Sequence, residues 1–371
     1  ADALLVNTTG GNNTAIGTFA LDANTTASNN TAVGQNALTA NTDGHSNTAL
    51  GSEAGKAITT GDENVAIGHG ALDGSDGSVT GNTAVGTDTM AHASYAGTYN
   101  TAVGYNAMLL ATSATGTTAI GNQCLDALTT GDNNTGVGAG ALGANTTGDS
   151  NVAVGYAALD ANTTSSNNTG IGINALGAQT TGSQNTAVGA SAMATNTTGA
   201  ANVAVGYRAL NTTNTGGNYN VAVGYDSMQA STTAVNNVAV GYDALKANTT
   251  GHENNAIGMS ALLTNTTGSY NEAIGYRALK LNTTGERNVA LGYEALAANT
   301  TAAYNVAIGM SSLNANTTGA SNTAVGYDAL KANTTGGANV AISQALGANT
   351  TGGNNIGIGY AALNAVTTAS E

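Results

Sequence analysis

Apolar and polar positions along this chain form a pattern that repeats every 17 residues. Each copy has the form N-x-A-[VI]-G-Y-x-A-L-x-A-N-T-T-G-x-x, and we use the glycine after Val or Ile as its anchor. The anchors are Gly17, Gly34, Gly51, Gly68, Gly86, Gly104, Gly121, Gly138, Gly155, Gly172, Gly189, Gly206, Gly224, Gly241, Gly258, Gly275, Gly292, Gly309, Gly326 and Gly359. One more copy, "NVAISQAL", lies between the last two anchors without its glycine, which makes 21 copies. A fixed period of this length is typical of a solenoid.

Several columns of the repeat are nearly constant, as packing positions would be. The residue four after the anchor is Leu or Met in 20 of 21 copies, with Gly55 as the exception. The residue four before the anchor is Asn in 20 of 21 copies, with Thr117 as the exception. If the copies stack, Leu packs on Leu, and the Asn side chains form a ladder of hydrogen bonds.

The repeat has no room for two helices, because 17 residues contain a central Gly, β-branched residues and an N-T-T-G corner. It predicts two short strands, over N-x-A-V and A-L-x-A, joined by corners at G-Y-x and N-T-T-G. The glycines are expected to supply positive φ or close backbone approach at both corners. Coils stacked about 4.8 Å apart would form a rod of roughly 100 Å. We therefore predict an all-β fold, a parallel β-solenoid (β-roll or β-helix) of about 21 coils that forms one continuous domain over residues 1–371.

The first strand also bears on assembly. Its Ala and its Val or Ile are adjacent, so they point to opposite sides of the strand, and both are apolar. One side faces the interior of the coil, and the other requires a second cover, for which a neighbouring chain is the natural choice. The pattern therefore predicts a homo-oligomer.

Composition narrows the class of protein. The chain has no Pro or Trp, one Phe, 52 Gly and only 8% charged residues, so a narrow core of Ala, Leu, Val and Ile is expected. Its formal charge is −14 with seven Lys and Arg, which disfavours binding to nucleic acid and to anionic membrane surfaces. No apolar run approaches the roughly 20 residues that span a bilayer. No signal peptide, starting Met or capping coil is visible, so we expect a segment of a longer fibre or a chain whose ends stack on other subunits.

Few residues offer chemistry. Cys124 occupies an Ala column, where a buried and inert thiol is expected. The histidines fall in different columns, so they form neither a metal site nor a catalytic triad: His45, His69, His92 and His252. "GVGAGAL" (Gly136–Leu142) and "GIGYAAL" (Gly357–Leu363) look like phosphate-binding loops, but the repeat already accounts for their glycines. We predict no catalytic, cofactor-binding or metal-binding residue, no cofactor and no enzymatic activity.

Two recurring polar features have structural interpretations. Asp62, Asp132 and Asp149 follow a corner Gly, where carboxylates that accept hydrogen bonds from turn amides are favoured over a calcium site. "NTT" occurs 13 times and formally reads as a glycosylation sequon, but turn chemistry explains its recurrence better. The 13 asparagines are Asn7, Asn24, Asn145, Asn162, Asn196, Asn211, Asn248, Asn265, Asn282, Asn299, Asn316, Asn333 and Asn349. Adjacent Thr residues point to opposite faces, so "TT" provides one outward file rather than the paired ranks expected for ice binding.

The residues "NTAVGYNA" (100–107) and "NVAVGYAAL" (151–159) resemble the head repeats of trimeric autotransporter adhesins. The longer phrase "NTAVGYDALKANTTG" (322–336) is more similar to the repeat arrays of phage tail-fibre and surface-fibre proteins that end in an endosialidase-type chaperone domain. The resemblance covers essentially the whole chain. It implies a homotrimer of parallel β-solenoids on a cell or virion surface.

We therefore expect an extracellular structural or adhesive fibre segment, a trimeric rod for attachment to a cell, host or surface. Its partners would be its own copies and a cell-surface glycan or protein receptor, with no nucleic acid and no membrane insertion. The alternative is a filament subunit that stacks end to end, and lower alternatives are an ice-binding or a polysaccharide-active β-helix. Stretches that break the period are candidate recognition loops: Ser75–Thr80, His92–Thr98 and Thr212–Gly217.

Overall fold

The structure, a computed structural model, describes residues 2–212 and 216–369 and forms two compact units, Ala1–Gln184 (unit 1) and Asn185–Glu371 (unit 2). Unit 1 contains ten strands: β1 (Thr14–Ile16), β2 (Thr31–Val33), β3 (Thr48–Leu50), β4 (Val65–Ile67), β5 (Thr83–Val85), β6 (Thr101–Val103), β7 (Thr118–Ile120), β8 (Thr135–Val137), β9 (Val152–Val154) and β10 (Thr169–Ile171). Unit 2 contains eleven strands: β11 (Thr186–Val188), β12 (Val203–Val205), β13 (Val221–Val223), β14 (Val238–Val240), β15 (Asn255–Ile257), β16 (Glu272–Ile274), β17 (Val289–Leu291), β18 (Val306–Ile308), β19 (Thr323–Val325), β20 (Val340–Ile342) and β21 (Ile356–Ile358).

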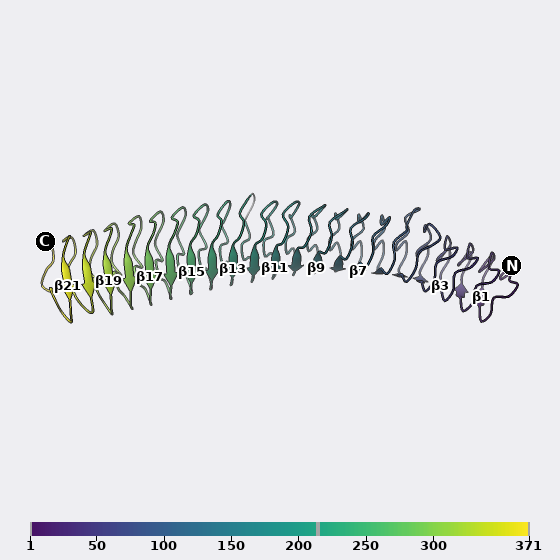
Figure 1. Cartoon of the computed structure of the whole chain (residues 1–371), viewed down its shortest axis with the longest axis horizontal. Coiled ribbons are helices and arrows are strands. Elements are labelled where there is room, and N and C mark those ends of the chain that lie inside the picture. Colours follow the sequence, from purple (N-terminus) through teal and green to yellow (C-terminus); the bar gives the residue numbers. More distant parts are fainter. Residues whose placement is uncertain (1, 213–215, 370–371) are drawn as a thin grey trace. The chain divides into compact units, whose positions relative to one another are not determined.

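Each unit is a parallel β-solenoid, as the repeat predicts. Within a unit, every strand pairs in parallel with the strands of the neighbouring coils, which lie side by side in Figure 1. The register follows the 17-residue period: Val221 pairs with Val238, and Val238 pairs with Asn255. Within the described residues no helix forms, so the prediction of an all-β solenoid of about 21 coils is confirmed.

The prediction of a second strand over A-L-x-A is wrong. In the coil that contains β14, Asp243 and Leu245 have φ values of 54° and 51°, and this left-handed backbone interrupts an extended strand. The segment forms a series of turns that still bond to the neighbouring coils: Leu245 N–H donates to Ala261 O at 2.9 Å. Burial of the Leu245 side chain, which has no exposed surface, and this hydrogen bond offset a conformation that is unfavourable for a bulky residue.

The interior of each coil is narrow and filled by the constant columns. In the same coil Ala239, Ala244 and Leu245 are fully buried, and so are the side chains of Asn237 and Asn248. The predicted Asn ladder is confirmed: Asn237 Nδ2 donates to Asn220 Oδ1 at 3.1 Å, and Asn237 Oδ1 accepts the backbone N–H of Asn254 at 2.9 Å. Because the amide of Asn237 finds partners in both neighbouring coils, its polar column is stable inside a small apolar core.

The two glycine columns act in the two ways that the sequence predicts. The anchor Gly241 has a φ of 137°, a region that other residues avoid. The corner Gly251 lies so close to the next coil that a Cβ atom there would overlap the carbonyl oxygen of Gly268. Positive φ at one corner and close backbone approach at the other are therefore both confirmed.

Candidate functional site: the strand face

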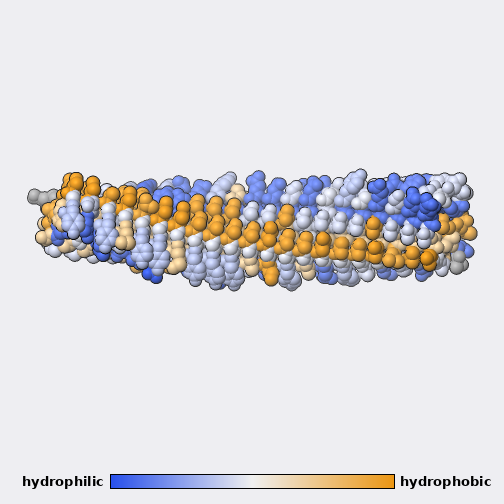
Figure 2. All heavy atoms as spheres, turned by 90° about the horizontal axis from the view of Figure 1, so that it is seen from below, coloured by the Kyte–Doolittle hydropathy of each residue, from blue (hydrophilic) through white to orange (hydrophobic). Residues whose placement is uncertain are grey.

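The surface formed by the strands carries most of the exposed apolar side chains that recur from coil to coil. In β2 to β21 the middle residue is buried, while the first and third point outward; in β1 the middle residue is half-buried. We define the strand face as these first and third strand residues together with the residue after each anchor. Val, Ile or Leu occupies the third position of every strand, and Figure 2 shows a line of apolar side chains along each unit. The prediction that Ala and Val or Ile point to opposite sides is confirmed.

The strand face differs in chemistry between the two units. The first strand residue is Thr in eight of the ten strands of unit 1, and Val or Ile in seven of the eleven strands of unit 2. Ten of the 14 Tyr lie in unit 2, against four in unit 1. The strand face of unit 2 is therefore the more apolar and aromatic of the two.

Tyrosines after the anchors form stacks along unit 2. The ring centroids of Tyr207 and Tyr225 are 5.2 Å apart, and those of Tyr225 and Tyr242 are 5.3 Å apart. Tyr276 and Tyr293 form a second stack at 5.0 Å. Such pairs add to the burial energy, because each ring covers one face of its neighbour.

Charged side chains line the border of this face in unit 2. The Asp226 side chain is 6% exposed, with Arg208 Nε 3.6 Å from its Oδ1 and Lys246 Nζ 3.0 Å from its Oδ2. Lys246 also bonds Asp243 at 2.9 Å, and this hydrogen bond raises the pKa of Lys246 above its usual value. The apolar face is thus bordered by charges that are already paired within the chain.

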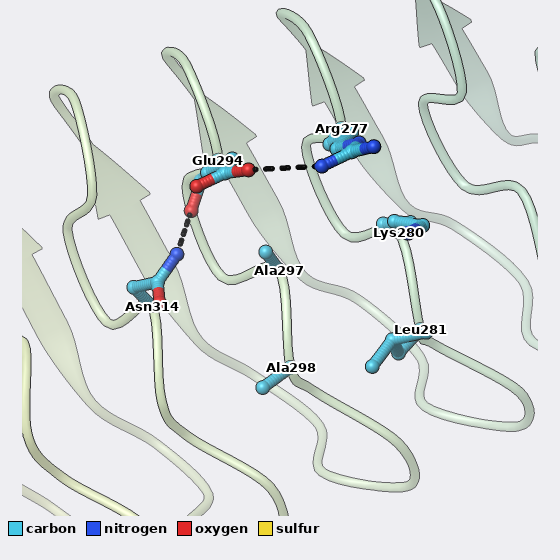
Figure 3. Close-up of a pocket in the computed structure, with 7 residues that line it drawn as sticks. All are labelled: Arg277, Lys280, Leu281, Glu294, Ala297, Ala298 and Asn314. Atoms are coloured by element: carbon cyan, nitrogen blue, oxygen red, sulfur yellow. Dashed lines mark hydrogen bonds and ion pairs between the residues drawn. The ribbon is translucent and has the colours of Figure 1, made fainter.

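A shallow pocket of about 200 Å³ is drawn in Figure 3, and its lining includes Arg277 and Glu294, the residues that directly follow Tyr276 and Tyr293 in the chain. It forms where one coil carries Ala297 and Ala298 between a coil with Lys280 and Leu281 and a coil with Asn314. At the edge of the pocket Arg277 Nη1 lies 3.5 Å from Glu294 Oε1, and Asn314 Nδ2 donates to the backbone oxygen of Glu294 at 3.0 Å. Most of its polar groups therefore satisfy one another.

Unit 1 is strongly acidic, with 13 Asp and Glu against one Lys, whereas unit 2 has eight Asp and Glu against six Lys and Arg. Burial raises the pKa of Asp73 above its usual value, and the nearby Asp88 and Glu53 raise it further. Burial likewise raises the pKa of Asp126. Among the residues that the structure describes, no group of three or more His, Cys, Asp or Glu could hold a metal ion.

The three corner aspartates act as predicted. Asp62 Oδ1 accepts the backbone N–H of His45 at 2.6 Å, and Asp149 Oδ1 accepts that of Asp132 at 2.8 Å. Asp132 in turn accepts the N–H of Thr115 at 2.7 Å. Each carboxylate therefore bridges one coil to the next.

The NTT asparagines are interior residues. Eleven of the 13 have no exposed side-chain surface: Asn24, Asn145, Asn162, Asn196, Asn248, Asn265, Asn282, Asn299, Asn316, Asn333 and Asn349. In the coil of β14, Asn248 Nδ2 donates to Gly251 O at 2.9 Å, and Asn248 Oδ1 accepts from Asn265 Nδ2 at 2.9 Å. Thr249 donates its hydroxyl to Thr266 O, which leaves Thr250 as the one outward Thr of the pair. The corner interpretation is therefore the one that the geometry supports.

Other residues singled out by the sequence lie apart from one another. Cys124 is fully buried, as predicted, and burial raises the pKa of its thiol to about 12. His45 Nδ1 accepts the Ser28 N–H at 3.0 Å, while His69 lies 3.8 Å from Asp88 on the surface. Within the part of the chain that the structure describes, no helix is long and apolar enough to cross a membrane.

Comparison with known proteins adds no family to this picture. No family model matches the chain, and no curated protein matches its sequence.

The period-breaking stretches are partly inside the core. Tyr95, within His92–Thr98, is fully buried, and its hydroxyl donates to Asn82 Oδ1 at 3.1 Å and accepts from Asn100 Nδ2 at 2.6 Å. Ser75 forms an isolated bridge with Tyr95. In the third stretch, residues 213–215 lie outside the described residues. Sequence reasoning missed the inward role of Tyr95, although the N-T-T-G corner is absent from its coil.

Proposed function

We propose that this chain is a non-enzymatic extracellular fibre segment that associates as a homotrimer through its strand faces and serves attachment to a cell, host or surface. The observation that carries the proposal is the uncovered strand face of unit 2. Its three columns consist mainly of Val, Ile, Leu, Tyr and Met, and only Glu272 among its residues is charged. A charge-poor, aromatic centre with a charged border is the composition of a protein interface.

The size of this face supports association between copies. Eleven coils spaced about 4.8 Å apart extend about 50 Å, and the columns from the first strand residue to the Tyr span about 13 Å. The face therefore offers about 650 Å², somewhat less than the roughly 800 Å² per partner of a standard interface. A large apolar surface left in water is unfavourable, and a second copy supplies the matching cover.

The attachment role rests on the resemblance of the repeats to those of surface fibres, and the chemistry of the columns agrees with a non-enzymatic role. The side chains that recur serve packing and ladder hydrogen bonds, and the acidic corner residues bond backbone amides. Copies that associate along their strand faces would make a stiff support for a receptor-binding region.

Light scattering coupled to size-exclusion chromatography tests the assembly. We expect three times the chain mass of 35.9 kDa, and a mass of one chain would overturn the proposal. The double variant V223D/V240D places carboxylates on the strand face and should yield monomers. The matched control T233D/T250D adds the same charges at exposed corner positions and should remain trimeric.

The attachment role has its own test. Fluorescently labelled trimer is applied to glycan arrays and to intact cells, and saturable binding is expected. Failure to bind any of these surfaces would overturn the attachment role and leave the structural one. Turnover of a glycan by the purified protein, abolished by a single Asp or Glu variant, would overturn the non-enzymatic assignment.

A further inference from the structure

Two adjacent coils of unit 2 break the apolar column of the strand face. The first strand residue is Asn255 in β15 and Glu272 in β16, and Val238 and Val289 stand on either side of the pair in the same column. Asn255 Nδ2 donates to Glu272 Oε1 at 2.7 Å, and both side chains are half-buried. Ile257 and Ile274, at the third strand positions, are 40% and 39% exposed.

The remainder of the face defines only weakly how two copies align. Most positions in its columns repeat from coil to coil, so a second strand face slipped by one or more whole coils would meet mostly the same Val, Ile and Tyr side chains. Register is weakly specified wherever a pairing surface repeats without interruption. A unique alignment requires residues that occur once along the face.

The pair of Asn255 and Glu272 meets that requirement. A carboxylate covered by a partner's Val column would lose water without gaining a hydrogen bond, which is strongly unfavourable. When copies lie parallel and level, Asn255 and Glu272 of each copy come opposite those of the next. The second N–H of each Asn255 amide can then donate to the neighbouring copy's carboxylate. Single polar residues fix register in this way in coiled coils.

We propose that Asn255 and Glu272 fix the register in which the strand faces of copies of this chain pair. This inference rests on the proposed self-association and adds the residues that determine its alignment. A mismatched carboxylate disfavours slipped arrangements by about tenfold or more, given the usual cost of a buried polar group left without a partner.

Disulfide trapping between copies measures the register. V306C and V340C place thiols on the strand face two coils apart, about 10 Å along the stack, beyond the roughly 7 Å between Cα atoms that a disulfide spans. The two variants carry different mass tags, are co-assembled, oxidised and analysed by mass spectrometry. In the otherwise native chain we expect disulfides between equal positions and mixed disulfides at least about tenfold rarer.

The same measurement in N255V/E272V tests the two residues. Both positions then carry the residue that neighbouring coils already have, so folding should persist, and mixed disulfides should rise toward their statistical share. The control T186V/T323V removes two other polar residues from the same column and should leave the pattern unchanged. A second variant, E272Q, keeps hydrogen bonding and should also preserve the native register.

The outcomes separate the two proposals. Monomers in every variant would overturn the self-association and the register role with it. Trimers whose disulfide pattern is the same with and without Asn255 and Glu272 would overturn the register role alone. Mixed disulfides that are already frequent in the native background would also overturn it.

Discussion

Asn237 Nδ2 donates a hydrogen bond to Asn220 Oδ1, 3.1 Å away in the preceding coil, and both side chains are fully buried. The same Asn237 donates to Gly251 O at 3.0 Å and accepts from both the backbone and the side chain of Asn254. The Asn237 amide therefore connects its own coil to the coil before it and to the coil after it, and it also bonds the corner of its own coil. This bonding explains why Asn occupies the column in 20 of 21 copies.

Replacing Asn237 with Ala should lower the free energy of unfolding by about 3 kcal/mol, because several buried donors and acceptors lose their partner at once. Urea denaturation followed by circular dichroism measures the change. Thr250→Ala, at an exposed corner position, should change the free energy by less than about 0.5 kcal/mol. Equal effects for the two variants would contradict a structural role for the ladder.

Replacing Gly241 with Ala should also destabilise the fold, by about 3 kcal/mol. Its φ of 137° is unfavourable for Ala, and the new Cβ would lie 2.6 Å from Gly258 O. Gly11, whose added Cβ would meet no atom within 4 Å, is the matched control and should tolerate Ala. A thermal melt of each variant compares them, and an unchanged midpoint for Gly241→Ala would refute the steric argument.

Cys124 should make the protein less stable at alkaline pH. Its folded pKa of about 12 exceeds the ordinary 9.0, so the unfolded chain releases the proton first as pH rises. The contribution of the neutral Cys124 thiol to the free energy of unfolding is therefore complete below pH 9 and is lost between about pH 9 and 12. Cys124→Ala, which restores the residue usual in that column, should show a shallower loss of stability over this range. A loss as steep as that of the native chain would argue against the thiol as the cause.

The buried NTT asparagines should resist glycosylation of the folded chain. Asn248 has no exposed surface and uses its amide in two hydrogen bonds, whereas Asn7 is exposed. Treatment of folded protein with a soluble N-glycosyltransferase, followed by peptide mass spectrometry, should modify Asn7 before any of the eleven buried positions. Early modification of Asn248 would show that this corner opens readily.

Residue columns predicted the solenoid because each column has one environment in every coil. The inward positions of Leu245 and Asn237 follow directly from their recurrence and spacing, which also place Ala239 and Val240 on opposite sides of the strand without showing which of them points outward. The turns over A-L-x-A could not be predicted in the same way, because nothing in Leu or Ala favours the left-handed conformation that Leu245 adopts there. That backbone is imposed by bonds to neighbouring coils, which a single repeat does not contain.

The candidate site was less accessible from the sequence. Asn255 and Glu272 look like ordinary variation at an x position until the strand places both on one face and in contact. Asp226 likewise looks like any acidic residue until Arg208 and Lys246, from two neighbouring coils, are seen to enclose it. These side-chain contacts between coils involve residues that differ from the consensus, so the consensus sequence does not predict them.

Among the described residues of each unit, hydrogen bonds join a coil to itself and to its immediate neighbours, typically 17 residues along the chain. A coil therefore has its first partner as soon as the preceding coil exists. Parallel sheets usually fold slowly, because distant segments must meet before any bond forms. In this fold, each new coil can bond to the coil folded just before it, so the chain can fold coil by coil while it is being synthesised.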